Sequence, residues 1–252
     1  MSFAVPAESY DRFMGVYSVQ LAPRLADLAG VENGQRVFDV GCGPGALSTE
    51  LVRRVGPDAV TAVDPSESFV EAARERHPGV TVQQASAEHL PFPDDSFDRA
   101  IAQLVVHFMA DPVAGLAEMG RVTRPGGVVA ACVWDHAGRQ SPLSMFWEAA
   151  RVLEPHVDDE SDLAGAREGH LRELFEAASL GEIEDTALSV AVEHPTFEDW
   201  WERFTLGVGP AGAFTASLEP GRLTELRELC RARLPPAPFT ITARAWAARG
   251  LA

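Results

Sequence analysis

Apolar residues follow two spacings that alternate along the chain from residue 9 to about residue 135. Short runs that are apolar at nearly every position are typical of strands buried on both faces of a sheet. These predicted strands are residues 36–40, 59–63, 80–84, 99–104 and 128–134. Between them, apolar positions recur every three or four residues, as expected for the buried face of a helix. The predicted helices are residues 9–29, 46–55, 67–76 and 112–122.

Strands that alternate with helices at this spacing are joined by right-handed crossovers, which place helices on both faces of a parallel sheet. After residue 135 the rhythm changes, and alternating segments predict strands over 183–192 and 238–247. Helical patterns cover residues 142–153, residues 169–179 and an aromatic-rich insertion before the last strand. We predict an α/β fold with a doubly wound, mostly parallel, seven-stranded sheet, an antiparallel C-terminal strand pair and a helical lid insertion.

The formal net charge of −16 argues against nucleic acid and anionic membrane surfaces as partners. Acidic residues outnumber basic ones 37 to 21, and every basic residue is Arg, whereas a phosphate backbone is bound by clustered Lys and Arg. No apolar run reaches the roughly 18 to 20 residues of a membrane span, and residues 1–13 lack the basic and apolar parts of a signal peptide. A soluble, cytoplasmic protein is therefore expected. Cys42, Cys132 and Cys230 show no CxxC spacing, so neither a disulfide framework nor a metal site is expected.

The clearest local motif is VFDVGCGPGALS at residues 37–48, in which a strand runs into a turn of small residues and then a helix. In open α/β sheets ligands bind at this carboxyl edge of the strands, and glycines let the backbone approach a ligand closely. The G-x-G-x-G spacing, with Asp39 ahead of it, differs from the G-x-G-x-x-G of dinucleotide-binding folds. Asp64 ends the next predicted strand, where a carboxylate can accept hydrogen bonds from both hydroxyls of a ribose. Together these features predict a site for a nucleoside cofactor.

Two further segments complete the pattern, SAEHLPFPDDSFD at 86–98 and EMGRVTRPGG at 118–127. In this order and spacing, the four elements resemble those of class I S-adenosylmethionine-dependent methyltransferases, and most of all the ubiquinone/menaquinone-biosynthesis-like, or type 11, small-molecule group. The likeness extends over about residues 9–135. It implies S-adenosylmethionine as the cofactor, S-adenosylhomocysteine as its product, and a small-molecule acceptor that is methylated on O, N, C or S by in-line displacement.

The resemblance also divides the chain into functional parts. Residues 1–252 are expected to form one methyltransferase domain, because no repeat, low-complexity tract or interdomain linker interrupts the sequence. Within it, residues 9–135 would form the cofactor-binding core. Helices at about 136–182 and 194–236 would cover the acceptor.

Particular residues take roles from the same resemblance. Asp39 and the backbone of the glycine-rich turn would hold the methionine part of the cofactor, and Asp64 would bind the ribose. Gln103, at the end of a strand, would face the methionine end. The glycines of that turn are Gly41, Gly43 and Gly45.

The remaining cofactor contacts lie around the adenine and over the cofactor. The backbone at Ala87 and the side chain of Glu88 would line the adenine site, and Tyr10 and Tyr17 match aromatic positions that cover the cofactor. Ser86 stands where the family often has Asp, so this position carries a hydroxyl in place of the carboxylate that would bond the adenine amino group.

Simpler interpretations of the acidic residues stay open. Asp39 could end a strand or cap the following turn, Asp64 could cap the helix that begins near Ser66, and Glu88 could be a solvated loop acid.

The acceptor side rests on position alone. His136 follows the strand over 128–134 and is the candidate general base, with Asp135 beside it to raise its basicity. His107 is better explained as a structural histidine. Trp200, Trp201 and Phe204 either line the acceptor pocket or form the core of the helical insertion.

Two other functions remain compatible with the sequence. A non-catalytic S-adenosylmethionine-binding regulator or partner subunit would carry the same motifs. An NAD-dependent oxidoreductase would also use the glycines and Asp64, but its third glycine is misplaced here and no Tyr-x-x-x-Lys pair exists in a chain without Lys.

Overall fold

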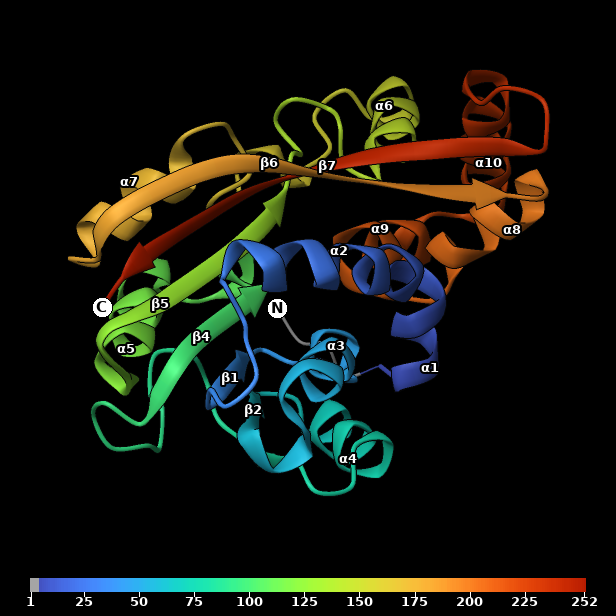
Figure 1. The fold of residues 1–252 in the computed structure, drawn as a ribbon. Helices are drawn as coiled ribbons and strands as arrows, with labels where there is room; N and C mark the ends of the chain where they lie inside the picture. The colour runs from blue at the N-terminus through green and yellow to red at the C-terminus, as the bar shows by residue number, and fades with distance from the viewer. Residues whose placement is uncertain (1–4) are drawn as a thin grey trace.

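The computed structural model describes residues 5–252. Part of the segment 1–13, for which the sequence analysis made an expectation, therefore lies outside the described residues. The seven strands are β1 (Val37–Val40), β2 (Val60–Asp64), β3 (Thr81–Gln84), β4 (Phe97–Gln103), β5 (Thr123–Trp134), β6 (Gly181–His194) and β7 (Phe239–Leu251). They form one sheet in the order β3-β2-β1-β4-β5-β7-β6 (Figure 1). Strands β1 to β5 pair in parallel, and β7 runs antiparallel to both of its neighbours. The predicted α/β sheet is confirmed.

Helices cover both faces of this sheet. They are α1 (Ala7–Tyr10), α2 (Val16–Leu28), α3 (Ala46–Val55), α4 (Glu67–Arg76), α5 (Pro112–Val122), α6 (Ser144–Leu153), α7 (His170–Ala177), α8 (Phe197–Trp201), α9 (Gly209–Ser217) and α10 (Pro220–Arg233). Neighbouring residues of a strand point to opposite faces, so Ile101 joins the core that contains Leu51 of α3, whereas Ala100 joins the core of Leu116 and Phe175. The sheet is therefore buried on both sides, as its apolar strands require.

Two segments differ from the predicted pattern. Thr123 already pairs with Phe97, and the amide of Gly126 donates to the carbonyl of Ala252 at 3.1 Å, so β5 begins five residues before the strand predicted at 128–134. The first helix is not uniform, because a π-helical stretch, η1 (Asp11–Gly15), separates α1 from α2.

The insertion between β6 and β7 packs against the rest of the chain through aromatic rings. Phe204, in the short helix η5 (Glu202–Thr205), stacks on Phe146 of α6 with ring centroids 4.4 Å apart. The ring of Phe13 in η1 meets Phe204 edge to face at 5.9 Å. Figure 1 shows α8, α9 and α10 gathered where β6 ends and β7 begins. No helix within residues 5–252 is long and apolar enough to cross a membrane.

Candidate functional site

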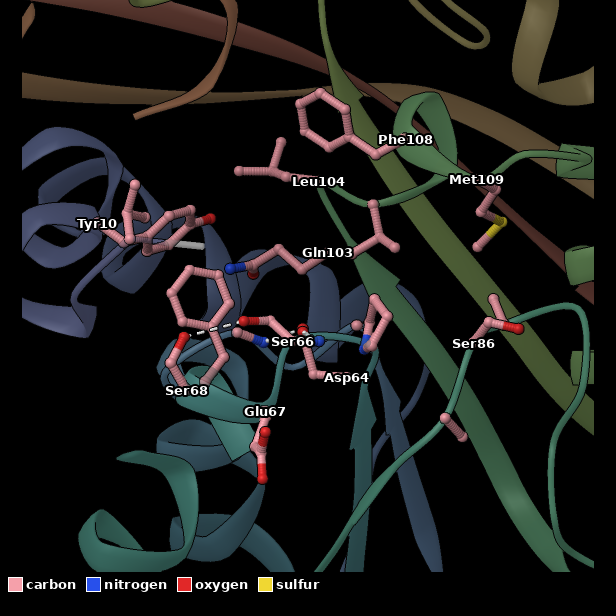
Figure 2. Close-up of a pocket in the computed structure, with 18 of the residues that line it drawn as sticks. Tyr10, Asp64, Ser66, Glu67, Ser68, Ser86, Gln103, Leu104, Phe108 and Met109 are labelled. Atoms are coloured by element: carbon pink, nitrogen blue, oxygen red, sulfur yellow. Dashed lines mark hydrogen bonds between the residues drawn. The ribbon is translucent and has the colours of Figure 1, made fainter. Parts of the chain in front are cut away.

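A cavity of about 960 Å³ opens at the carboxyl ends of β1, β2 and β4 (Figure 2). Seven of the ten residues predicted to contact the cofactor line it, namely Tyr10, Gly41, Gly43, Asp64, Ala87, Glu88 and Gln103. The other lining residues are Val5, Pro6, Pro65, Ser66, Glu67, Ser68, Phe69, Ala85, Ser86, Leu104, Val105, Phe108, Met109 and Ala110. The cavity therefore lies where parallel α/β sheets bind ligands.

The three glycines of the turn have left-handed φ angles but face different surroundings. A Cβ on Gly41 would lie 2.5 Å from the side chain of Val105, and one on Gly45 would lie 2.8 Å from the ring of His77. A Cβ on Gly43 would meet only Tyr10, at 4.0 Å. Gly41 and Gly45 therefore allow close packing of protein on protein, and Gly43 leaves room in the cavity itself.

Asp64 is fixed by the backbone on both sides of the cavity floor. Its Oδ2 accepts from the amide of Gly43 at 2.9 Å, and its Oδ1 accepts from the amide of Ser66 at 2.8 Å. Burial raises the pKa of this carboxyl, and the two amide bonds oppose that rise. Each carboxylate oxygen keeps a further lone pair for a ligand hydroxyl. The position matches a carboxylate that binds a ribose.

Asp39 lies beneath the turn and is not among the residues that line the cavity. Its Oδ2 accepts from the hydroxyl of Ser48 at 2.6 Å, while Oδ1 has no hydrogen-bond partner within the described chain. Burial raises the pKa of Asp39 to about 7, the Ser48 bond lowers it, and the nearby Asp64 raises it further. The carboxyl is therefore held at the edge of ionisation until a cation or donor approaches.

Gln103 and Tyr10 face each other across the cavity (Figure 2). The amide nitrogen of Gln103 donates to the carbonyl of Ser18 at 3.1 Å, and its Oε1 lacks a partner among residues 5–252. Tyr10 packs edge to face on Phe69 at 5.4 Å, and burial raises its pKa to about 12. A neutral phenol and an unsatisfied amide oxygen thus border the space between β4 and α1.

The side of the cavity predicted to hold adenine is closed by Glu88. Its Oε1 accepts from the amides of Ala110 at 2.8 Å and Asp111 at 3.3 Å. Burial raises the pKa of Glu88, but these amides and the Ser86 hydroxyl outweigh it and leave the pKa lowered. Glu88 is therefore an ionised side chain that connects its own loop to the loop at Ala110 and Asp111. Its sequence position did not predict this contact.

Leu104, the residue after β4, has φ of +61° and is buried against the cavity. Such a left-handed conformation costs a non-glycine residue about 1–2 kcal/mol. Its amide still donates to the carbonyl of Cys132 at 2.9 Å, so this hydrogen bond to β5 stabilises the strained conformation. Sequence reasoning missed Leu104, because Gly and Asn, not Leu, signal this conformation.

Tyr17 and Gly45 do not line the cavity. The hydroxyl of Tyr17 lies 2.9 Å from Nε2 of His194, whose Nδ1 lies 3.2 Å from Asp199 Oδ2. Arg203 donates to the same carboxylate at 2.9 Å. This buried chain of polar groups ties α2 to the end of β6 and to α8, and burial raises the pKa of Tyr17 above its usual range.

His136 lies in a separate, small chamber at the end of β5, with a volume of about 10 Å³ and walls that include Trp147, Asp159 and Glu160. Neither ring nitrogen of His136 has a hydrogen-bond partner within the described residues. Burial lowers its pKa to about 4, although Asp159 and Asp135 raise it. The ring of His107 lies 6.0 Å away between centroids. The general-base role of His136 stays a prediction, and its surroundings make it a buried neutral histidine.

Glu160 is the second buried titratable group of this chamber. Trp147 donates its indole N–H to Glu160 Oε2 at 2.9 Å. Burial raises the pKa of Glu160 to about 7, Trp147 lowers it and Asp159 raises it. Near pH 7 the chamber therefore contains a mainly neutral histidine, His136, and a carboxyl, Glu160, that is about half protonated.

The aromatic residues predicted for the acceptor pocket lie in the insertion's own core. Trp200, Trp201 and Phe204 are all buried, and none is on the lining of the 960 Å³ cavity. Trp200 packs on Phe204 at 4.6 Å and Trp201 on Phe197 at 6.3 Å between ring centroids. Their role in acceptor binding stays a prediction, and these contacts fit the alternative of a packed helical core.

Residues 5–252 contain neither a candidate metal site nor a disulfide. No group of three or more His, Cys, Asp or Glu side chains there is placed to hold a metal ion. Cys42, Cys132 and Cys230 are free and buried.

Comparison with known proteins shows what this chain is similar to. Residues 38–131 match a protein family described as a methyltransferase domain. The chain is 44% identical over 126 residues to 2-methyl-6-phytyl-1,4-hydroquinone methyltransferase 2 of Oryza sativa subsp. japonica, covering 49% of this chain and 36% of that protein. It is 34% identical over 157 residues to malonyl-[acyl-carrier protein] O-methyltransferase of Erwinia pyrifoliae, covering 58% and 59%. It is 36% identical over 135 residues to ubiquinone/menaquinone biosynthesis C-methyltransferase UbiE of Bdellovibrio bacteriovorus, covering 50% and 57%.

The chain therefore spans 36% to 59% of the length of these relatives. Solved structures extend the likeness to the fold of nearly the whole chain. The [4+2]-cyclase SpnF superposes with a TM-score of 0.57 at 20% identity, covering 92% of this chain and 81% of that one. A geranyl diphosphate methyltransferase, solved in complex with S-adenosylmethionine, gives 0.54 at 17% identity, covering 93% and 85%.

The sheet order, the glycine-rich turn and the carboxylate after β2 define the class of protein, which is the class I methyltransferase fold. Residues 38–131 of this chain are similar to a methyltransferase domain, and the chain shares the fold of solved methyltransferase structures.

Proposed function

We propose that the chain transfers a methyl group from S-adenosylmethionine to a small-molecule acceptor. The observation that carries the proposal is the arrangement of Gly43, Asp64 and Gln103 around one cavity. Gly43 leaves the wall open, Asp64 offers carboxylate lone pairs, and Gln103 offers an unpartnered oxygen. These are the complements of a close backbone approach, a ribose diol and an ammonium group, which are the parts of this cofactor.

The roles proposed for individual residues follow from these contacts. Asp64 would accept from the ribose hydroxyls, since both of its oxygens are already oriented by backbone amides. Gln103 Oε1 would accept from the ammonium of the methionine part. Asp39 would act electrostatically from beneath the turn, because a nearby positive charge lowers the pKa of a buried carboxyl. The backbone at Ala87, with Ser86 and Glu88, would border the adenine.

The bound cofactor supplies an activated methyl on a sulfonium. The chain's own residues then contribute position and a dry site, which can supply much of the rate of a single displacement step. Leu104, Val105 and Phe108 exclude water from the end of the cavity beyond Gln103. Tyr10 covers the cavity from the opposite side. No histidine is among the described lining residues, which favours an acceptor that needs little help from a base.

The single-domain division and the lid are part of the same proposal. Residues 9–135 would hold the cofactor, and the helices at about 136–182 and 194–236 would cover the acceptor. Support comes from the contact of Phe204 with Phe13, which joins the insertion to the helix that carries Tyr10. Loss of this contact would alter the position of η1, and therefore of Tyr10, which precedes η1 and lines the cavity.

A second candidate function is a cofactor-binding protein that does not transfer the methyl group. It is favoured by one observation, the close superposition on a [4+2]-cyclase, because a fold does not fix the reaction that it supports.

Calorimetry with S-adenosylhomocysteine and with NAD tests the cofactor, and transfer of a labelled methyl group to an acceptor library tests the reaction. We expect the first ligand to bind and NAD not to bind. Tight NAD binding would contradict the proposal, and binding without transfer to any acceptor would favour the second candidate.

A further inference from the structure

The cavity has a polar end and an apolar end. Asp64, Ser66 and Ser86 lie on one side of Gln103, and Leu104 and Phe108 lie on the other (Figure 2). Val105 extends the apolar wall beside Gly41. If the polar end holds the cofactor, as proposed above, the apolar end is the space left for the acceptor.

The charges on the lining all have one sign. Asp64, Glu67 and Glu88 supply three carboxylates, and no Arg is among the lining residues within the described chain. Because the sequence contains no Lys, Arg is its only permanently charged basic side chain. The cofactor brings one net positive charge, from a sulfonium, an ammonium and a carboxylate, so three carboxylates exceed it. A buried anion without a cationic partner is strongly disfavoured.

The apolar wall is held in place rather than adaptable. Leu104 is fixed in a left-handed conformation by its amide bond to Cys132, and only 6% of its surface is exposed. Phe108 ends a short helix, η3 (Val106–Phe108), and its ring lies 3.9 Å from the ring of the buried His107. Backbone strain that persists at a site is a mark of function.

We infer that the acceptor is an uncharged, largely apolar molecule that packs on Leu104 and Phe108, and that carboxylates and phosphates are rejected. This inference rests on the proposed function, because it assigns the polar end to the cofactor. It makes Phe108 a specificity-determining residue, because its partly buried ring lies on the cavity lining.

A matched pair of probes tests the inference. The two compounds are 4-propylphenol, which is neutral at pH 7, and 4-propylbenzoate, which has the same ring and chain but carries a negative charge. Binding to protein saturated with S-adenosylhomocysteine is measured by calorimetry. The phenol is expected to bind at least about tenfold more tightly, because the benzoate would be desolvated without a partner.

The variant Phe108→Arg supplies the missing cation and is expected to move the preference at least about tenfold toward the benzoate. Val19→Arg adds the same charge at an exposed site on α2 and should leave the preference unchanged, which controls for net charge. Equal or tighter binding of the benzoate by the unmodified protein overturns the inference, and so does binding of neither probe. Failure of S-adenosylhomocysteine to bind would instead overturn the proposed function.

Discussion

Two regions at the carboxyl edge of the sheet each contain a buried titratable side chain. They differ in the volume of the cavity beside that side chain and in the direction in which burial shifts its pKa. Asp39 lies beneath a cavity of about 960 Å³, and burial raises its pKa to about 7. His136 lies in a chamber of about 10 Å³, and burial lowers its pKa to about 4. In both cases burial favours the neutral form. Only Asp39, however, lies next to a volume in which a positively charged ligand could restore the charged form.

The difference teaches how to separate a functional group from a structural one at this edge. A positively charged ligand in an open cavity can stabilise the ionised form of a buried acid beside it. A buried base in a chamber of about 10 Å³ has no room beside it for a ligand. The sequence predicts a functional role for both, Asp39 from the motif that contains it and His136 from its position after a strand. The volume beside them, which no local pattern encodes, distinguishes them.

The largest expected effect concerns Asp39. Its folded pKa of about 7 lies above the unfolded value of 3.8, so the stability it contributes is present below pH 3.8 and is lost as pH rises through 7. Asp39→Asn should remove a pH-dependent loss of about 4 kcal/mol in the free energy of unfolding. Urea unfolding at pH 4.5 and 8 measures it, with the exposed Asp58→Asn as control. An unchanged pH dependence in Asp39→Asn would sink this account.

The chamber should show the opposite trend. The folded pKa of His136, about 4, lies below the unfolded value of 6.5, so its contribution is present above pH 6.5 and is lost as pH falls through 4. His136→Leu should remove about 3 kcal/mol of this loss. Glu160 titrates with the sign of Asp39, so only the difference between parent and variant isolates the histidine. Exposed His156→Leu is the control. A loss of stability at pH 8 in His136→Leu, with the acid dependence intact, would contradict the prediction.

Filling the cavity should abolish cofactor affinity. A leucine at Gly43 projects into the space that faces Tyr10, so Gly43→Leu should weaken S-adenosylhomocysteine binding by about 100-fold or more, or about 2.7 kcal/mol. Gly34→Leu is the matched control, because Gly34 also has a left-handed φ and open space but lies in an exposed turn. Both variants should lose stability from backbone strain, about 1–2 kcal/mol each. Equal affinity in the two variants, by calorimetry, would show that Gly43 does not face the cofactor.

The smallest expected effect is loss of one charge from the cavity floor. Asp64→Asn keeps one acceptor oxygen but loses the charge, so cofactor affinity should fall by about 1.5–3 kcal/mol. Glu67→Gln removes a charge from an exposed residue on the same lining and should change affinity by less than about 0.5 kcal/mol, because solvent screens it. Calorimetry with S-adenosylhomocysteine compares them. Similar losses in the two variants would mean that net charge, and not the ribose contact, governs binding.

Most of the fold could be predicted because its signals are local and repeated. The strand over 128–134 is apolar at every position, and it is buried throughout within β5. Helix α9 lies within the helical region predicted at about 194–236, although its sequence begins Gly-Pro-Ala-Gly, a pattern typical of a loop. Burial of Ala211 and Thr215 overrides that preference. The extended start of β5 was missed because Pro125 and the glycines beside it suggest a turn, while pairing with β4 and with Ala252 decides the outcome.

The candidate site divides in the same way. Gly43, Asp64 and Gln103 could be placed on it because each follows a strand end, and parallel strand ends meet at one edge. Leu104 and Phe108 could not, because their place depends on strain and on packing against β5 and His107. Tyr17 was predicted as a cofactor contact, but a long-range bond to His194, 177 residues away, fixes its side chain elsewhere.

Strand β7 separates β5 from β6 in the sheet, although it is the last strand in the sequence. This order determines when β5 can pair with its neighbour during synthesis of the chain. The apolar edge of β5 is complete at Trp134, but its partner begins at Phe239. At roughly 5–20 residues per second on the ribosome, that edge waits about 5 to 20 s for a neighbour. An unpaired apolar edge is a template for aggregation. The speed at which the ribosome translates residues 135–238 therefore governs how much of the newly made chain escapes aggregation, before any cofactor or acceptor is met.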